Sequence, residues 1–389
     1  MRPRRILLLL AAALALGLHL TPRGARRPGG RVVPPAVWSV PPARIPAPGP
    51  PKVVEDFLGP GDGVVSVHVA SLAEVTPGVL AAAWYGGSRE GARDVAILLS
   101  LRDGNAASGW TRPRPIVTAT SAEQELGRHV RKVGNPLIYS DGRGRLELLF
   151  VTIAVGGWSG SSLNLKSSAD GGITWSPATR LVLSPFLNIS ELVKNPPAPL
   201  EGGGWAVPIY HEFLGKFPEI LWLDVPGAPA RATRTRPFGG RTAFQPALAA
   251  TSEAEAVLLC RTAGEQTELF RSHTADGGLT WSPPEPGGVP NPGSGIAAIR
   301  LADGRLLLAF NDAPSGRDNL RLAVSADGGQ TWRRGATVAS EPGAEFSYPF
   351  LLQASDDTIH LVFTWKRERI RHLAFNSAWL DASLEESSK

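Results

Sequence analysis

Hydrophobic and polar positions follow one repeating arrangement along this chain: an apolar run of strand length, a turn rich in Gly or Asp, and a second apolar run. Short apolar runs bounded by Gly, Pro and Asp are typical of β-strands, and no long stretch shows the spacing of an amphipathic helix. The arrangement occurs six times, beginning near Val67, Gly134, Lys194, Phe244, Ser294 and Phe346. The pattern therefore predicts six units of paired strands.

A second motif repeats with the same period. It reads SADGGITWS, TADGGLTWS and SADGGQTWR around Asp170, Asp276 and Asp327. Asp-Gly-Gly between two strands favours a tight hairpin, because Gly takes positive φ and the Asp side chain accepts hydrogen bonds from its own turn. One carboxylate per copy is too few for a Ca²⁺ site. We interpret the motif as a structural turn between the third and fourth strands of a unit, at the outer rim.

The spacing of these turns indicates the fold class. The last two aspartates lie about 50 residues apart and the first two about twice as far, so one unit between them lacks the motif. A unit of this length contains a few short strands that cannot bury both faces alone and must stack on neighbouring units. We predict an all-β, six-bladed β-propeller over residues 51–389, one domain although the length would allow two.

Composition supports this fold and argues against some functions. The 389-residue chain is 43% hydrophobic and 19% charged, with 43 Gly and 35 Pro, as expected for a large core built from short strands and turns. Part of the net charge of +5 lies in two basic segments near the N-terminus, and no basic stripe with interleaved aromatics follows. Nucleic acid is therefore not an expected partner. The single Cys260 is expected in the core.

The N-terminus has the pattern of a targeting segment. A basic start precedes an apolar run at residues 6–20, which is short for a membrane span and suits a signal peptide. No tidy cleavage site follows, so residues 1–24 are expected to be either a signal peptide or an uncleaved membrane anchor. Residues 25–50 form a Pro- and Arg-rich linker, expected to be an extended spacer. The protein is expected to be exported: periplasmic, secreted or anchored to the membrane.

The three copies of S/T-A-D-G-G-x-T-W resemble the Asp boxes of the sialidase (neuraminidase) superfamily and its BNR-repeat relatives, and the resemblance covers nearly the whole folded region. It implies a six-bladed propeller. It does not by itself imply an activity, because unrelated propellers also carry such turns. Sialidases hold the substrate carboxylate with three arginines, attack with a Tyr assisted by a Glu, and use an Asp as acid/base.

Several residues of this chain match that scheme. Arg261 and Arg317 each lie between the second and third strands of a unit, where the family has its second and third arginines. Tyr348 begins the first strand of the sixth unit, where the family has its nucleophile, and Glu345 precedes it and is a candidate to polarise the phenol. Each of these residues also has a structural interpretation, as a solvated loop charge or a packing tyrosine.

The acid/base candidates are Glu90 and Asp94 in YGGSREGARD, the loop where the family keeps its aspartate. Glu90 is nearer the tip of the loop and is favoured, while Asp94 opens the next strand and is expected to cap or orient its neighbours. Either carboxylate has an alternative role as a salt-bridge partner of a neighbouring arginine.

Two positions depart from the family. His68 stands where sialidases have their first arginine, and Gln245 stands where they have the glutamate that assists the tyrosine. Gln is not a base, and His grips a carboxylate less firmly than Arg.

Other first strands also begin with polar residues next to Pro or Gly: Asn135, Lys194 and Ser294. Together with His68, Arg261 and Arg317 they predict a polar, cationic pocket at the propeller axis, which suits an acidic sugar.

The sequence thus predicts an exported, sialidase-like glycoside hydrolase acting on a terminal acidic sugar of a glycan. The alternatives are a carbohydrate-binding propeller without catalysis, motivated by His68 and Gln245, and a glycosidase or lyase acting on a different sugar. A protein-interaction platform would leave the polar strand starts unexplained. No cofactor or metal is required, and the oligomeric state is left open.

Overall fold

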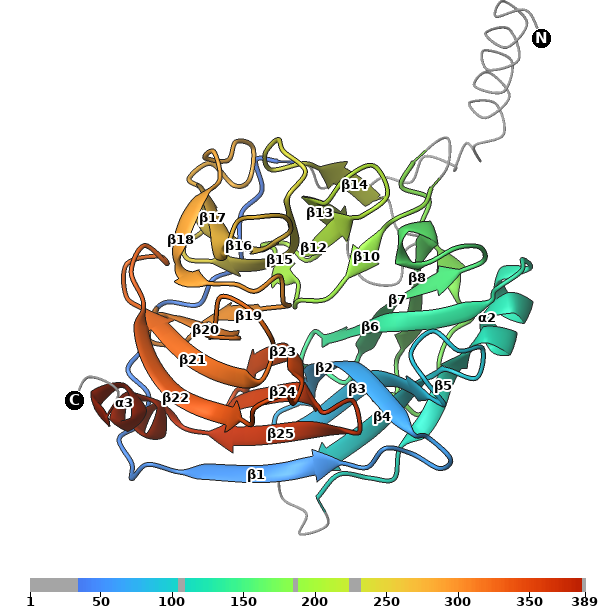
Figure 1. Ribbon diagram of the computed structural model, residues 1–389, viewed down its shortest axis with the longest axis horizontal. Helices are drawn as coiled ribbons and strands as arrows, with labels where there is room; N and C mark the ends of the chain where they lie inside the picture. Colours follow the sequence, from blue (N-terminus) through green and yellow to red (C-terminus); the bar gives the residue numbers. More distant parts are fainter. Residues whose placement is uncertain (1–33, 104–108, 185–187, 224–231, 387–389) are drawn as a thin grey trace, which may run out of the picture.

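Six four-stranded or five-stranded antiparallel sheets are arranged in a ring around a central axis (Figure 1). The computed structural model describes residues 34–103, 109–184, 188–223 and 232–386. The leader predicted at residues 1–24 and the first part of the predicted linker lie outside these ranges. Within them, no helix is long and apolar enough to cross a membrane. The prediction of an all-β, six-bladed propeller is confirmed.

The blades follow one another in chain order, and each is a meander of neighbouring strands. Blade 1 contains β2 (Ser66–Thr76), β3 (Val79–Gly87), β4 (Ala96–Asp103) and β5 (Arg114–Thr118), and blade 2 contains β6 (Lys132–Ser140), β7 (Leu146–Ile153), β8 (Ser161–Ser168) and β9 (Thr179–Arg180). Blade 3 contains β10 (Leu192–Val193), β11 (Ala198–Pro199), β12 (Trp205–His211), β13 (Phe217–Leu223) and β14 (Ala232–Thr235). Its inner strand is broken, so that β10 and β11 both pair with β12.

Blade 4 contains β15 (Ala243–Ala250), β16 (Ala256–Thr262), β17 (Glu268–Thr274) and β18 (Glu285–Pro290), and blade 5 contains β19 (Ala297–Arg300), β20 (Leu306–Phe310), β21 (Asn319–Ser325) and β22 (Arg333–Ser340). Blade 6 contains β23 (Phe346–Gln353), β24 (Ile359–Trp365) and β25 (Arg369–Phe375), and takes its outer strand β1 (Val53–Leu58) from the other end of the chain. The register runs from Val53 opposite Phe375 to Leu58 opposite Ile370, and this pairing closes the ring (Figure 1).

Three short helices complete the described chain: α2 (Ala119–Leu126), the 3₁₀ helix η1 (Trp158–Gly160) and α3 (Ser377–Glu386). Thr118 and Ser121 form a capping box at the start of α2, which ends at Gly127 in the left-handed conformation. Helix α3 buries Leu380 and Leu384 in the core of blades 5 and 6.

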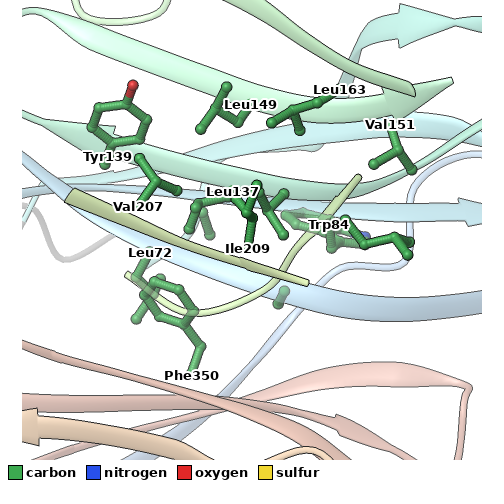
Figure 2. Packing of buried hydrophobic residues seen from close by; sticks show 14 of the residues in the cluster. Leu72, Trp84, Leu137, Tyr139, Leu149, Val151, Leu163, Val207, Ile209 and Phe350 are labelled. Atoms are coloured by element: carbon green, nitrogen blue, oxygen red, sulfur yellow. The ribbon is translucent and has the colours of Figure 1, made fainter. Parts of the chain in front are cut away.

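The core lies between adjacent blades. In one cluster, side chains from blades 1, 2, 3 and 6 pack together, including Trp84, Leu137, Ile209 and Phe350 (Figure 2). Consecutive blades bury each other's apolar faces, as the stacking argument requires. Cys260 is fully buried on β16, as predicted, and burial raises the pKa of its thiol.

The described part of the predicted linker, expected to be an extended spacer, lies against the propeller. Trp38 is fully buried among blades 3 and 4, with its ring centroid 5.5 Å from that of Trp222. The amide of Arg44 donates to the carbonyl of Ala302, and its guanidinium pairs with Asp357. Sequence composition identified an extended segment, but one large aromatic residue anchors it to the ring.

The repeated turns join the third and fourth strands of blades 2, 4 and 5, as predicted. In blade 4, the Oδ1 atom of Asp276 accepts from the backbone amide of Thr280 (2.9 Å) and from the hydroxyl of Thr274 (2.8 Å). Gly278 has φ +79°, and a Cβ there would lie 2.9 Å from the Trp222 ring, so only Gly fits. These turns follow the third strands, and the loops between second and third strands precede them. The turns and the loops therefore lie on opposite faces of the propeller.

Replacing the turn aspartate should lower stability without affecting ligand binding. The hydrogen bonds from the Thr174 side chain and amide, with that from Ser168, lower the pKa of Asp170 to about 2. An ionised Asp170 therefore stabilises the fold above the unfolded pKa near 4, and this stabilisation is lost as pH falls through the folded value. Asp170→Ala should lower the midpoint of thermal unfolding at pH 7, and the difference from wild type should shrink between about pH 4 and pH 2.

Glu201→Ala is the matched control, because Glu201 is an exposed turn carboxylate with no side-chain hydrogen bond to the described residues. Equal midpoints for Asp170→Ala and Glu201→Ala at pH 7 would contradict a structural role for the turn.

Candidate functional site

The inner strands of four blades contain the same β-bulge where they approach the axis. The ladder register shifts in β2, β6, β15 and β23, and each shift spans two residues. The first residue of each bulge has positive φ: Val69 (50°), Asn135 (43°), Gln245 (48°) and Tyr348 (52°). A bulge re-aims the side chain of its extra residue, and non-Gly residues at positive φ are uncommon. The three polar residues of this set, Asn135, Gln245 and Tyr348, lie close to residues of the neighbouring blades.

The register explains one difference from the sequence analysis. His68 was matched to the start of blade 1, but the residue equivalent to Asn135, Gln245 and Tyr348 is Val69. His68 precedes the bulge, and its ring lies edge-on to that of Tyr348, with centroids 4.7 Å apart. A residue-by-residue motif match could not locate the bulge, because the extra residue is defined by pairing with β3.

His68 is buried between two tyrosines. Its ring centroid also lies 5.8 Å from that of Tyr85, and its Nδ1 atom lies 3.1 Å from the Oγ1 atom of Thr364. Burial, followed by the positive charge of Arg367, lowers the pKa of His68 to about 4. The imidazole is therefore neutral at neutral pH and has the capacity to accept a proton.

Consecutive blades each supply one arginine at or beyond the end of the second strand. Arg261 lies on β16 of blade 4, where a position between strands was expected, while Arg317 and Arg367 lie in the segments after β20 and β24 of blades 5 and 6. An Arg261 Nη atom donates to the Oε1 atom of Gln245 (2.9 Å), and its guanidinium stacks on Phe244. The Arg317 guanidinium lies 5.8 Å from the Tyr348 ring centroid. Three guanidinium groups at one end of the axis form a site suited to a carboxylate.

Two carboxylates share the third of these arginines. Arg367 forms ion pairs with Glu90 and, at 2.7 Å, with Glu345. Glu345 also accepts from the Ser347 hydroxyl and lies 3.6 Å from Arg317. Burial favours a raised pKa for Glu90 and Glu345, but the Arg367 hydrogen bonds and positive charges outweigh it, and both pKa values lie below the ordinary range. Both side chains are therefore ionised at neutral pH.

Blades 2, 3 and 4 are linked by a tyrosine hydroxyl. The Oη atom of Tyr210, on β12, accepts from the Asn135 amide (3.2 Å) and from the Gln245 amide (2.9 Å). Gly295 from blade 5 lies beside this group, since a Cβ there would be 3.3 Å from the Gln245 Oε1 atom and 3.1 Å from the Tyr348 ring. Gln245 and Tyr348 thus both lie against the space that a side chain at position 295 would fill.

We refer to the residues gathered in this way as the axial site: His68, Glu90, Asn135, Tyr210, Gln245, Arg261, Arg317, Glu345, Tyr348 and Arg367. Eight of them are among the residues selected from the sequence. The loops that carry the arginines lie on the face opposite the repeated aspartate turns, as expected.

The other sequence candidates have different surroundings. Lys194 is buried, and its ammonium donates to the carbonyls of Ile296 and Pro349 and to the side chain of Asn195. Its three donors are thus occupied by protein acceptors, and Lys194 ties blade 3 to blades 5 and 6 rather than facing a ligand. The Ser294 hydroxyl is fully buried and has no hydrogen-bond partner among the described residues.

Asp94 is exposed and turned toward its own loop. It accepts from the amide (2.9 Å) and the hydroxyl (3.0 Å) of Ser88, and these bonds, that from the amide first, lower its pKa. This is the capping role considered for it from the sequence, and Glu90 is the carboxylate that reaches the axial site.

Sequence reasoning missed Arg367 and Tyr210. A signal for Arg367 was available, because it follows the second strand of blade 6 as Arg317 follows that of blade 5. Tyr210 carries no such signal. It lies within an apolar second strand, and only the convergence of Asn135 and Gln245 on its hydroxyl distinguishes it from a packing residue.

Comparisons with known proteins agree with this architecture. The family model described as BNR repeat-like domain matches residues 78–361. No curated protein sequence matches significantly. The fold is similar to a Hadza microbial sialidase, with 18% identity, a TM-score of 0.66, and coverage of 83% of this chain and 67% of that chain. It is also similar to the intramolecular trans-sialidase of Ruminococcus gnavus, with 14% identity, a TM-score of 0.64, and coverage of 84% of this chain and 98% of that chain.

A protein of unknown function from Dyadobacter fermentans is equally similar, with 13% identity, a TM-score of 0.65, and coverage of 83% of this chain and 99% of that chain. At such identities a likeness shows the fold, and the chemistry has to be argued from the axial site. The resemblance to sialidase-like BNR-repeat proteins is confirmed.

Removing the Arg367 charge should destabilise the fold in a pH-dependent way. Arg367→Met leaves Glu90 and Glu345 without their shared cation, so their pKa values should rise. We expect a loss of about 1–2 kcal/mol at pH 7, discounted for solvent screening because the Arg367 side chain is 37% exposed. The loss should diminish toward pH 4, where the carboxylates take up protons. Urea unfolding at both pH values measures this.

Arg89→Met, in the same loop as Glu90 but exposed, is the matched control and should be near wild type. A loss for Arg367→Met that is equal at both pH values would mean that packing, and not charge, is what Arg367 provides.

Proposed function

The chain belongs to the family of BNR repeat-like domains, and from this premise we propose that its axial site binds a terminal acidic sugar of a glycan, sialic acid or a related sugar, and hydrolyses the glycosidic bond. The observation that carries the proposal is a set of three arginines, one each from blades 4, 5 and 6, at or beyond the end of the second strand, with Arg317 beside the Tyr348 ring. Neutral sugars do not need such a concentration of guanidinium groups, whereas a sugar carboxylate is bound by them in planar, bidentate geometry.

The three arginines are expected to have different roles. Arg261 has no carboxylate within salt-bridge distance among the described residues, and Arg317 has only Glu345, at 3.6 Å. Arg367 is already neutralised by two carboxylates. A substrate carboxylate is therefore expected on Arg261 and Arg317, while Arg367 positions Glu90 and Glu345.

Tyr348 is the proposed nucleophile. A neutral phenol can approach an anionic sugar without the repulsion that a carboxylate nucleophile would meet. Its oxygen forms a bond to the anomeric carbon as the bond to the leaving group breaks, and the phenol proton passes to a base. His68 is the proposed base, supported by the contact of its neutral ring with that of Tyr348 and by the presence of Gln245 where sialidases have a glutamate.

Glu90 is the proposed proton donor to the leaving oxygen. It acts as an acid only in its protonated form, which its lowered pKa makes scarce at neutral pH, so activity should rise on the acidic side. Water then attacks the anomeric carbon and gives a proton to the Glu90 carboxylate, the bond to Tyr348 breaks, and the phenol oxygen regains its proton from His68. The cycle returns the enzyme unchanged.

A second candidate function is sugar binding without turnover. Gln245 is not a base, and both Glu90 and Glu345 are held as anions by Arg367. These two observations favour a lectin-like propeller that uses the same arginines to retain an acidic sugar. Uronic acids belong in the test of either candidate, because a different sugar acid would engage the same arginines.

Tyr348→Phe separates the two candidates. On aryl glycosides of sialic and uronic acids, the substitution should lower kcat at least about 100-fold, because it removes the nucleophile. Affinity for the free sugar acid, measured by calorimetry, should change little. Arg261→Met should weaken binding about 10-fold or more through the loss of charge-assisted hydrogen bonds. Tyr139→Phe, which alters a buried tyrosine packed on Trp205, is the matched control.

Undiminished turnover by Tyr348→Phe would remove Tyr348 as nucleophile. Sugar binding by the wild type without turnover of any glycoside would favour the lectin-like function. Absence of both would refute the proposal.

Export is a further part of the proposal, supported by the basic start and the apolar run at residues 6–20. The full chain, expressed in a bacterium with two membranes, should be recovered in the periplasm or with the membrane. A chain that begins at residue 34 should remain in the cytoplasm. Recovery of both chains from the cytoplasm would contradict export.

A further inference from the structure

The hydroxyl of Tyr210 has an unusual set of partners. Tyr210 is 2% exposed, and its oxygen lies within hydrogen-bond distance of the side-chain amides of Asn135 and Gln245. A phenol oxygen can accept two hydrogen bonds and donate one. What the hydroxyl does therefore depends on which atom each amide presents to it.

The orientation of the Gln245 amide is determined by Arg261. A guanidinium only donates hydrogen bonds, so the atom of Gln245 that lies 2.9 Å from the Arg261 Nη must be the carbonyl oxygen Oε1. The amino group Nε2 then faces Tyr210, at 2.9 Å.

The orientation of the Asn135 amide is determined by the backbone. The carbonyl of Val193 only accepts, so the Asn135 atom 3.3 Å from it must be the amino group Nδ2, and the same group lies 3.2 Å from the Tyr210 Oη. Both amides therefore donate to the phenol oxygen, and neither can accept its proton.

The proton of Tyr210 consequently has no acceptor among the described residues. Burial, and then the negative charge of Glu212, raises the pKa of Tyr210 far above its ordinary value, so the proton stays on the oxygen at any pH the protein would meet. The Asn135 Oδ1 atom, next to it, likewise receives no hydrogen bond from the described residues. A donor and an acceptor without protein partners thus lie together beside the Gln245–Gly295–Tyr348 contact.

We propose that Tyr210 is a specificity residue of the axial site: its O–H donates to an oxygen of a substrate hydroxyl, and Gln245 enforces that polarity. The inference rests on the proposed function, since it concerns how the same site recognises a hydroxyl group of the sugar in addition to the carboxylate. A hydroxyl is itself both donor and acceptor, so it fits the Tyr210 proton and the Asn135 Oδ1 together. Tyr210 does not form or break a bond.

This role explains why glutamine occupies position 245. A glutamate there would pair with Arg261, and because a carboxylate only accepts, it would take the Tyr210 proton for itself. Gln245→Glu should therefore make the Tyr210 hydroxyl a donor within the protein, while its oxygen still accepts from Asn135, and so withdraw its proton from the substrate. The difference from the sialidase pattern at position 245 is then a change in the group that faces Tyr210: an amide that donates a hydrogen bond in place of a carboxylate that accepts one.

The first experiment measures that polarity without any ligand. The intensity ratio of the tyrosine Fermi doublet in the ultraviolet resonance Raman spectrum is high when the phenol oxygen only accepts and low when the phenol donates. The chain has four tyrosines, so subtracting the spectrum of Tyr210→Phe isolates Tyr210. Subtracting the spectrum of the Gln245→Glu, Tyr210→Phe double variant from that of Gln245→Glu gives the ratio for Tyr210 when residue 245 is a glutamate. We expect a high ratio in the wild type and a clearly lower ratio with Gln245→Glu, where the phenol donates to the glutamate and still accepts from Asn135.

The second experiment measures recognition. Calorimetric titration with the acidic sugar and its monodeoxy analogues should show binding weakened about 3- to 10-fold by Tyr210→Phe, the effect of one neutral hydrogen bond. One analogue, lacking the hydroxyl that Tyr210 reads, should bind wild type and Tyr210→Phe equally. Tyr139→Phe serves again as the control and should discriminate the analogues as the wild type does.

The outcomes are distinguishable. A low Raman ratio in the wild type, or a ratio unchanged by Gln245→Glu, overturns the assigned polarity whether or not a sugar binds. A high ratio together with wild-type recognition by Tyr210→Phe overturns the substrate contact and leaves the proposed function intact. If the wild type binds no acidic sugar, the proposed function fails and the substrate contact with it, while the Raman ratio still decides the polarity.

Discussion

Each blade of this protein has two apolar faces, and the need to bury both is the constraint on which the rest of the structure depends. Stacking six blades in a ring satisfies it, provided that the ring closes, and closure is achieved when β1 pairs with β25 along its whole length. Because the inner strands then converge on one axis, the bulges of β6, β15 and β23 bring Asn135, Gln245 and Tyr348 together although they are far apart in sequence.

Charge balance shapes the axial site as much as geometry does. Arg367 neutralises Glu90 and Glu345 and holds both as anions, which leaves Arg261 and Arg317 as the cations available to a ligand. Around Tyr210, the direction of each hydrogen bond is set by a chain from Arg261 to Gln245 to Tyr210. The site thus combines an ionic part suited to a carboxylate with a neutral part suited to a hydroxyl.

Several residues show how far sequence reasoning reached. Tyr348, Glu90, Arg261 and Arg317 were selected from their places relative to the strands, and those places are preserved because each blade repeats the same meander. Lys194 was selected by the same logic, but its ammonium is bound by carbonyls of blades 5 and 6. Its position could not be derived from local pattern, because it depends on how the ring packs.

The sequence by itself determined the number of blades, the position of the repeated turns and the end of the blades at which polar residues gather. These follow from period and local turn chemistry, which act over a few neighbouring residues. Only the tertiary structure decided that His68 lies beside Tyr348, that Arg367 joins two carboxylates, and that Tyr210 receives two amide donors. Except for the Arg367–Glu345 pair within blade 6, those contacts join residues of different blades, and the distances between them are set by closure of the ring rather than by any local pattern.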